Sequence, residues 1–189
     1  MPAPAICTQP LPYVDLLETR PAASIDTVVI HCTELPDLAM ARQYGERVLY
    51  PSGTGNSGHY YIDRDGAIAE YVPPLRIAHH TRGWNPRSIG IELVNTGRWP
   101  YWTYSRHQAM DEPYTHAQIA ALIGLLQQLQ ASFPSLANIA GHEDLDQDEV
   151  DASDDPAIRV RRKRDPGPLF PWPRILQEVA LLRVDTHTE

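Results

Sequence analysis

The feature that most constrains the fold is the run Asp-Thr-Val-Val-Ile-His-Cys from Asp26 to Cys32. Its apolar residues fall on both faces of an extended chain, whereas a strand with one solvated face alternates apolar and polar residues. A strand of this kind is stable where other layers cover both faces of its sheet. We therefore expect a central strand, and this strand carries a histidine, His31, near its end.

Further strands and helices follow from the same kind of pattern. Residues 88–94 alternate, with isoleucine and leucine on one face and Glu92 on the other. Thr115 is a suitable N-cap for an amphipathic helix over residues 116–133. The other predicted elements are strands at 59–63, 67–72 and 139–142, an Asp-Gly hairpin turn at 64–66, and helices at 36–50 and 171–183. This order predicts a single α/β domain with a mixed central β-sheet flanked by helices.

The length of 189 residues fits one domain. We expect an extended N-terminal lead-in over residues 1–24, the domain itself over 25–183, and a short tail over 184–189. The net charge of −8 argues against a nucleic-acid partner, because phosphate contacts need a basic face. No apolar stretch reaches the length of a membrane-spanning helix, so we expect no membrane insertion, and we expect a monomer.

The start of the chain and the cysteines bear on the compartment. Residues 1–7 lack the basic and apolar regions of a secretory signal, so we expect a cytoplasmic protein as synthesised. Two cysteines, Cys7 and Cys32, give no disulfide framework. On an alternating strand Cys32 would face away from His31, and we interpret it as a small buried apolar residue.

A second informative segment is Arg-Arg-Lys-Arg-Asp-Pro-Gly-Pro, residues 161–168. The proline keeps Asp165 extended, so Lys163, two residues earlier, would share its face. His31 and His142 each end a short apolar strand, and both could converge on Asp165. Two imidazoles and one carboxylate make a zinc site with an open fourth position, as in catalytic zinc centres. A lone strand-end histidine is more often structural, so the residues alone leave both interpretations open.

Several motifs follow one another in order along the chain. They include Ser-Ile-Gly-Ile-Glu-Leu from Ser88 and Lys-Arg-Asp-Pro-Gly-Pro from Lys163, and the full set occupies residues 28–31, 57–66, 85–93, 141–142 and 163–168. Together they resemble the zinc-dependent N-acetylmuramoyl-L-alanine amidases of the AmpD and phage-lysozyme kind, whose fold is shared with peptidoglycan recognition proteins. The resemblance covers nearly the whole chain, and its motifs are specific in combination.

The resemblance implies that His31, His142 and Asp165 bind Zn²⁺ as the cofactor. It implies that Glu92 carries a proton from the attacking water to the leaving amine, and that Lys163 stabilises the oxyanion. The alternative for Glu92 is a buried structural pair with an arginine. The alternative for Lys163 is a run of solvated basic side chains.

The resemblance also places His80 at the wall of the cleft, and we expect His80, Trp84 and Asn85 to bind the substrate. The family's Trp-His-Ala-Gly is replaced here by His-His-Thr-Arg-Gly over residues 79–83, which leaves the substrate preference open. Gly58 stands where phage lysozymes carry a catalytic tyrosine, which favours the variant that depends on a glutamate. We interpret the neighbouring His59 as structural.

Two long segments have less certain roles. Residues 143–155 are intensely acidic, with eight Asp or Glu among thirteen, and such a composition predicts a flexible, solvated loop without a metal ligand. Residues 96–113 contain two tryptophans and two tyrosines in one short stretch, 99–104. Those aromatic rings would either stack on sugar faces or cover the core.

The function that these observations predict is zinc-dependent hydrolysis of the amide bond between N-acetylmuramic acid and L-alanine, in peptidoglycan or muropeptides. Two alternatives stay open: a non-catalytic peptidoglycan-binding module on the same fold, and a metallohydrolase that cleaves another amide. Intact wall and recycled fragment are both possible substrates. Recycling, phage lysis and delivery by a secretion system are all possible settings.

Overall fold

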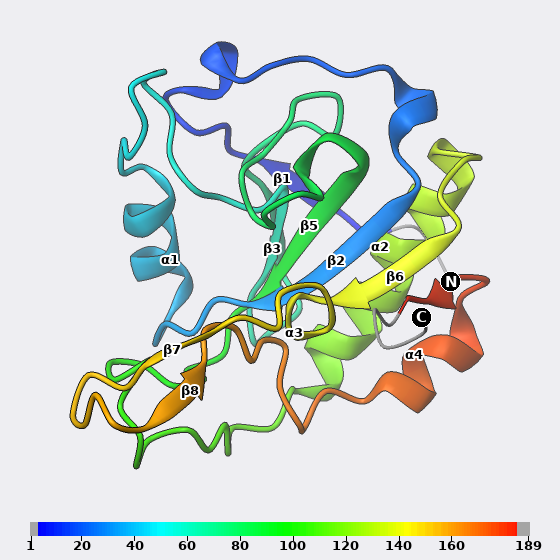
Figure 1. The fold of residues 1–189 in the computed structure, drawn as a ribbon. Coiled ribbons are helices and arrows are strands. Elements are labelled where there is room, and N and C mark those ends of the chain that lie inside the picture. Colours follow the sequence, from blue (N-terminus) through cyan, green and yellow to red (C-terminus); the bar gives the residue numbers. More distant parts are fainter. Residues whose placement is uncertain (1–3, 185–189) are drawn as a thin grey trace.

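The computed structural model describes residues 4–184 and is built on one mixed sheet of seven strands in the order β1-β4-β3-β5-β2-β6-β9 (Figure 1). Within it only β3 and β4 pair antiparallel. The strands are β1 (Ile6–Thr8), β2 (Thr27–Cys32), β3 (Tyr60–Ile62), β4 (Ile68–Glu70), β5 (Ser88–Leu93), β6 (Asn138–Gly141) and β9 (Leu182–Arg183). The predicted α/β class with a mixed sheet is confirmed, and β2 is an interior strand in which all six residues are buried.

Helices cover both faces of this sheet. The α-helices are α1 (Leu38–Gly45), α2 (His116–Ser132), α3 (His142–Leu145) and α4 (Trp172–Glu178), and short 3-10 turns are η1 (Val14–Leu16), η2 (Ala22–Ser24) and η3 (Asn85–Arg87). In Figure 1, α2 runs behind the sheet, and its leucines join Val28 and Ile30 of β2 in the larger hydrophobic core. The opposite face carries a second core in which Ala41 of α1 meets Tyr61 of β3. Full burial of each such side chain contributes about 1.5–3 kcal/mol.

Helix α2 begins where the sequence predicts. The Thr115 hydroxyl accepts a hydrogen bond from the backbone N–H of Gln118 at 3.0 Å, and the Gln118 side chain accepts one from the backbone N–H of Thr115 at 3.1 Å. This capping box satisfies two amide groups that a helix start otherwise leaves without partners. The buried residues Ile119, Leu122 and Leu126 form the predicted apolar stripe.

The predicted strands differ from the observed ones by one or two residues at their ends, and larger differences occur at three places. Helix α1 begins at Leu38, because Asp37 caps it by accepting from the backbone N–H of Met40 at 2.7 Å, and it ends at Gly45 rather than at residue 50. Helix α4 ends at Glu178, because the chain then extends and Leu182 and Arg183 pair with β6. The predicted lead-in over residues 1–24 contributes the edge strand β1 and buried side chains to the second core.

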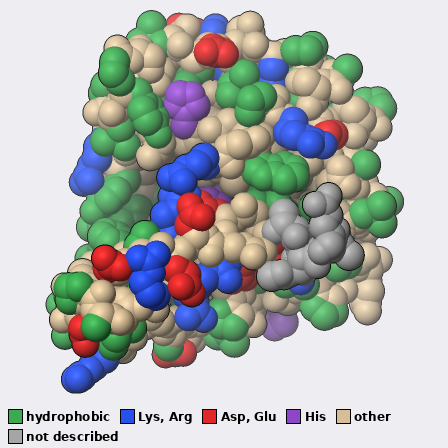
Figure 2. All heavy atoms as spheres, in the orientation of Figure 1, with side chains coloured by type: hydrophobic (Ala, Val, Ile, Leu, Met, Phe, Trp, Pro, Cys, Tyr) green, Lys and Arg blue, Asp and Glu red, His purple; other side chains and the backbone are tan. Residues whose placement is uncertain are grey.

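The acidic segment is ordered, and the prediction of a flexible loop was wrong. Strand β7 (Glu149–Asp151) pairs antiparallel with β8 (Arg159–Arg161), and α3 occupies the beginning of the segment. Acidic and basic side chains are mixed over this part of the surface (Figure 2). The ion pairs join Asp144 to Arg183, Asp146 to Arg162, Asp148 to Arg82 and Asp151 to Arg159. These arginines remove the like-charge repulsion on which the prediction depended.

No helix within residues 4–184 is both long and apolar enough to span a bilayer.

Candidate metal centre

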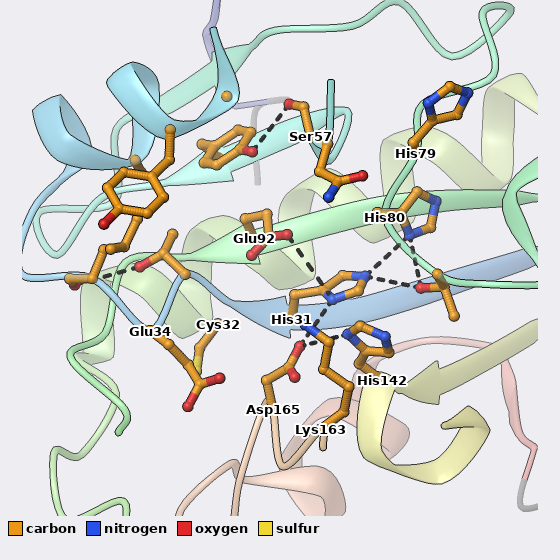
Figure 3. A pocket seen from close by; sticks show the side chains of 18 of the residues that line it. His31, Cys32, Glu34, Ser57, His79, His80, Glu92, His142, Lys163 and Asp165 are labelled. Carbon is orange, nitrogen blue, oxygen red and sulfur yellow. Dashed lines mark hydrogen bonds and ion pairs between the residues drawn. The ribbon is translucent and has the colours of Figure 1, made fainter. Parts of the chain in front are cut away.

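The three predicted ligands meet at one end of the central strands. Strands β2 and β6 are parallel neighbours in which Ile30 pairs with Gly141, so the residues that follow them, His31 and His142, lie side by side. Asp165 comes from the loop after β8, and all three side chains are buried. Figure 3 shows the two imidazoles and the carboxylate turned toward one point.

The ligand geometry fits a metal ion. His31 Nδ1 lies 2.9 Å and His142 Nδ1 lies 3.0 Å from the same oxygen, Asp165 Oδ2, and the three candidate ligand atoms lie within 4.8 Å of one another. Tetrahedral zinc with bonds of about 2.0–2.1 Å separates its ligand atoms by roughly 3.3 Å. The other carboxylate oxygen, Asp165 Oδ1, is buried without a hydrogen-bond partner. Two imidazoles and a carboxylate are also the donor types that zinc accepts.

Electrostatics favour the metal-binding protonation states of His31 and Asp165. Burial and the neighbouring His142 lower the pKa of His31 to about 4, so its imidazole is neutral at pH 7. Burial alone would raise the pKa of Asp165, but the two histidines hold it well below its ordinary value. A neutral imidazole and an ionised carboxylate are the ligand forms of these residues.

His31 has a second set of partners on its other nitrogen. Its Nε2 lies 3.0 Å from Nδ1 of His80 and 3.3 Å from the hydroxyl oxygen of Thr81. A neutral His31 that offers Nδ1 as a ligand carries its proton on Nε2, which then donates to His80. Such an outer contact fixes the tautomer and the ring orientation of a metal-binding histidine.

The place of His80 depends on a glycine. A side chain at Gly90 would put its Cβ 2.6 Å from Cγ of the His80 ring, so the ring occupies the space that the glycine leaves. The space on strand β5 beside Glu92 is therefore filled by His80. The Gly in Ser-Ile-Gly-Ile-Glu was the sequence signal for a close neighbour at this position.

Two of the three predicted substrate residues line the cavity, and the third does not. His80 and Asn85 are among the residues that line the cavity. Asn85 accepts hydrogen bonds from the backbone N–H groups of His80 and Thr81, at 3.0 and 2.8 Å, and so holds that loop. Trp84 is not among the lining residues, and the Arg87 guanidinium lies 5.1 Å from its ring centre.

Glu92 stands beside the ligands on strand β5. It pairs in register with His31, and its Oε1 lies 3.9 Å from His31 Nδ1. Burial and the Asp165 charge raise the pKa of Glu92 to about 8, and Lys163 opposes this shift. Within residues 4–184 no arginine forms an ion pair with Glu92, so the alternative of a structural pair is wrong. A Cβ at Gly58 would lie 2.9 Å from Glu92 Cγ, which explains the glycine at that position.

His59 is structural, as predicted. It is fully buried, its Nδ1 accepts from the backbone N–H of Gly90 at 3.0 Å, and its Nε2 lies 2.9 Å from an Arg20 nitrogen. Cys32 is buried and Cys7 is exposed, and neither forms a disulfide.

The ligands lie at the floor of a cavity of about 630 Å³. This volume is within the usual range for sites that take small molecules. Lys163 lines the cavity beside Asp165, as their spacing predicts, and Figure 3 shows the two side chains next to each other. The other lining side chains include three arginines, Arg82, Arg98 and Arg162, and four tyrosines or tryptophans, Tyr44, Tyr50, Tyr61 and Trp102.

The aromatic segment 99–104 partly covers the core and reaches the cavity at one residue. Trp99 and Trp102 pack against the second core, and Trp102 also lines the cavity. Tyr101 and Tyr104 are exposed, at 57% and 38%. Only Trp102 is therefore placed to touch a molecule in the cavity.

Comparison with known proteins agrees with this geometry. The family model described as N-acetylmuramoyl-L-alanine amidase matches residues 21–168. The 1,6-anhydro-N-acetylmuramyl-L-alanine amidase AmpD of Salmonella typhimurium is 35% identical over 142 residues, which cover 70% of this chain and 60% of that relative. The matched part of the chain therefore spans about 60% of the length of this curated relative.

Solved structures share the fold. The amidase AmiD from E. coli, in complex with anhydro-N-acetylmuramic acid-L-Ala-D-gamma-Glu-L-Lys, superposes with a TM-score of 0.63 and 27% identity, covering 84% of this chain and 58% of that one. The Drosophila peptidoglycan recognition protein SA superposes with a TM-score of 0.62 over 97% of this chain and 99% of that one. Its identity is 16%, so it supports the fold alone.

Proposed function

Because the chain belongs to the N-acetylmuramoyl-L-alanine amidase family, we propose that it hydrolyses the amide bond between N-acetylmuramic acid and L-alanine. The observation that carries the proposal is the convergence of His31, His142 and Asp165 with Glu92 at the floor of one cavity. A binding module would need the cavity but would have no need for a glutamate beside a complete ligand set.

Zinc is the metal that we propose for the ligand set. A zinc ion held by His31, His142 and Asp165 would act as a Lewis acid toward the scissile carbonyl and toward water. The donor set, the unpartnered Asp165 Oδ1 and the neutral His31 all favour this ion.

The chain's own side chains account for the proton transfers. The oxygen of water attacks the carbonyl carbon of the muramic acid lactyl group, and Glu92 in its ionised form, which the positive charge of a bound zinc ion would favour, accepts the proton that the water releases. The carbon–nitrogen bond then breaks, and Glu92 gives that proton to the amine of L-alanine. Lys163 carries a positive charge beside Asp165, where it stabilises the oxyanion of the tetrahedral intermediate.

The cavity suits a substrate with a sugar and a short peptide. The aromatic side chains Tyr44, Tyr50 and Trp102 offer apolar faces, and the basic Arg82 and Arg162 offer partners for carboxylates. The E. coli AmiD complex contains a substrate with both parts, a sugar and a peptide that includes γ-linked glutamate. We propose the same class of substrate here, with His80 and Asn85 supporting the floor of the site.

Metal analysis together with product analysis tests this proposal. Purified protein should contain one zinc per chain, and incubation with soluble anhydromuropeptide or with isolated sacculi should release stem peptides that begin with a free L-alanine amine. Asp165→Ala should lose both zinc and activity. Glu92→Gln should keep zinc and lose at least about a hundredfold in kcat. The same change at Glu46, which pairs with Arg42 on the surface of α1, should leave both unchanged.

Zinc-loaded wild-type protein that releases no peptide from either substrate would contradict the proposed activity. Binding of sacculi without cleavage would instead support the binding-module alternative. Product analysis that shows cleavage at another amide would support a different metallohydrolase.

A further inference from the structure

A buried ion pair that the proposed chemistry does not use lies beside the cavity. The side chains of Glu34 and Arg98 are 9% and 1% exposed. Arg98 donates from Nε to Oε1 at 2.7 Å and from a terminal nitrogen to Oε2 at 2.9 Å, and its backbone N–H also lies 3.2 Å from Oε1. A planar guanidinium matches a carboxylate in this two-pronged way, whereas a lysine ammonium does not.

The backbone has positive φ angles at Glu34 and at Gly97, which lies next to it. Glu34 has φ of 49°, in the left-handed region that residues with a Cβ rarely adopt. Across from it, Gly97 has φ of 52°, and a Cβ there would lie 2.7 Å from Glu34 Cγ. An outlier of this kind persists where surrounding contacts impose it, and it often marks a functional constraint. Here the indole N–H of Trp102 donates to the Glu34 carbonyl at 3.1 Å and helps to impose it.

The rest of the guanidinium reaches the segment that carries two site residues. Arg98 donates to the carbonyl oxygen of Arg161 at 2.9 Å and to that of Arg162 at 3.2 Å. A further N–H lies 3.3 Å from the side-chain oxygen of Gln108. A guanidinium has five N–H groups, and each of the five has an acceptor here. The two carbonyls come directly before Lys163 and shortly before the ligand Asp165.

The pair therefore joins two parts of the metal centre. Glu34 follows the ligand His31 by three residues, and Arg98 holds the carbonyls that precede Lys163. No strand pairing joins these two parts directly, because β8 pairs only with β7 outside the main sheet. We propose that Glu34 and Arg98 act as positioning residues that fix Lys163 and Asp165 relative to His31. This inference rests on the proposed function only for its catalytic readout.

A second ion pair in the same region provides a matched control. Arg64 donates to Glu112 at 2.6 Å, and Glu112 also accepts from the backbone N–H of Thr96, so this pair anchors the other end of the segment 96–113. Within residues 4–184, the side-chain hydrogen bonds of Arg64 reach Glu112, Pro36 and Thr96, and none reaches residues 161–165. Arg98→Lys and Arg64→Lys therefore each remove an arginine that holds the segment 96–113. Only Arg98→Lys also removes hydrogen bonds to the carbonyl oxygens of Arg161 and Arg162, which precede Lys163.

The test measures zinc affinity by chelator competition, the visible spectrum of the Co²⁺-substituted protein, and kcat and KM on a soluble muropeptide. We expect Arg98→Lys to weaken zinc binding or lower kcat by about 10–100-fold, with a changed Co²⁺ spectrum and KM within about twofold. Arg64→Lys should leave all of these within twofold, even if its melting temperature falls. Glu34→Gln, which keeps the shape and one acceptor oxygen, should fall between wild type and Arg98→Lys.

Unchanged zinc affinity, spectrum and kcat in both Arg98→Lys and Glu34→Gln would overturn the inference and leave the pair a structural one. Equal losses in Arg98→Lys and Arg64→Lys would overturn it as well, because general loosening of the segment 96–113 would then explain them. If Arg98→Lys does not fold, Glu34→Gln decides by the same readouts. The zinc and Co²⁺ measurements need no substrate, so a wild-type protein that cleaves no muropeptide would contradict the proposed function and not this inference.

Discussion

The replacement of Gly90 by alanine should displace His80 and so weaken metal binding by its neighbour His31. The new Cβ would stand 2.6, 2.7 and 2.9 Å from three atoms of the His80 ring, where ordinary contacts are 3.4 Å or more, so the ring must retreat by about 1 Å. That retreat lengthens the 3.0 Å contact between His80 and His31 Nε2 beyond hydrogen-bonding distance. Overpacking of this size lowers the free energy of unfolding by about 1–3 kcal/mol. Loss of the outer partner of a ligand weakens metal binding by about 10–100-fold.

Urea unfolding of the zinc-free protein and chelator competition measure these two effects separately. Gly45→Ala is the matched control, because the nearest atom to its Cβ would be 3.5 Å away, an ordinary contact. In a His80→Ala background the clash disappears, so Gly90→Ala should then cost less than about 0.5 kcal/mol, while zinc affinity stays low. If Gly90→Ala is equally destabilising with and without the His80 ring, strand β5 and not His80 is the cause, and the reasoning fails.

Three further changes have expected outcomes. Lys163→Met should keep zinc and the fold but lower kcat on muropeptides by about a hundredfold or more, with the neighbouring Arg164→Met near wild type in the same steady-state assay. A Gly-Ser bridge in place of residues 149–160, which form most of the β7–β8 hairpin, should leave the zinc content unchanged and reduce cleavage of sacculi more than of soluble muropeptides. Loss of zinc with an unchanged circular dichroism spectrum would instead mean that a metal ligand lies within residues 149–160. Burial would raise the pKa of Glu112, but hydrogen bonds from Arg64 and Thr96 outweigh burial and lower it. The stability from this carboxylate is therefore present above about pH 4.5, its unfolded value, and is lost as the pH falls further; Glu112→Gln should flatten that part of the melting-temperature profile.

The parts of the fold that the sequence predicts are those with a strong local signal. Helix α2 has a capping residue, Thr115, and an apolar stripe, and both lie within a few residues of each other. Strand β2 is recognisable because an unbroken β-branched run needs cover on both faces. The short strands β1 and β9 have no such signal, since two or three residues show no periodicity and their strand state comes from pairing at the sheet edges.

The errors came from partners that are distant in the sequence. The acidic segment was counted as a block of like charge, but Arg82 and Arg183 lie 66 and 39 residues from the aspartates they meet. The Glu34 and Arg98 pair spans 64 residues and has no motif. The convergence of His31, His142 and Asp165 could be anticipated because the resemblance to a family supplied the pairing information that local pattern lacks. The resemblance did not predict that the His80 ring packs against Gly90, because this contact depends on the conformation of the loop that carries His80.

The meeting of the ligands at the ends of β2 and β6 has a consequence for how the protein matures. His31 and Asp165 lie 134 residues apart, so the unfolded chain offers the metal at most a pair of ligands close in sequence, His142 and Asp165. A metal that binds only the native arrangement stabilises it by mass action, by about 4 kcal/mol when free metal exceeds the dissociation constant a thousandfold. During synthesis the full set exists only after residue 165 has left the ribosome and the sheet has formed. If the site binds zinc as proposed, metal loading is a late event that stabilises a nearly complete domain. A chain that ends between residues 149 and 160 would then have both histidines but would lack the ligand Asp165.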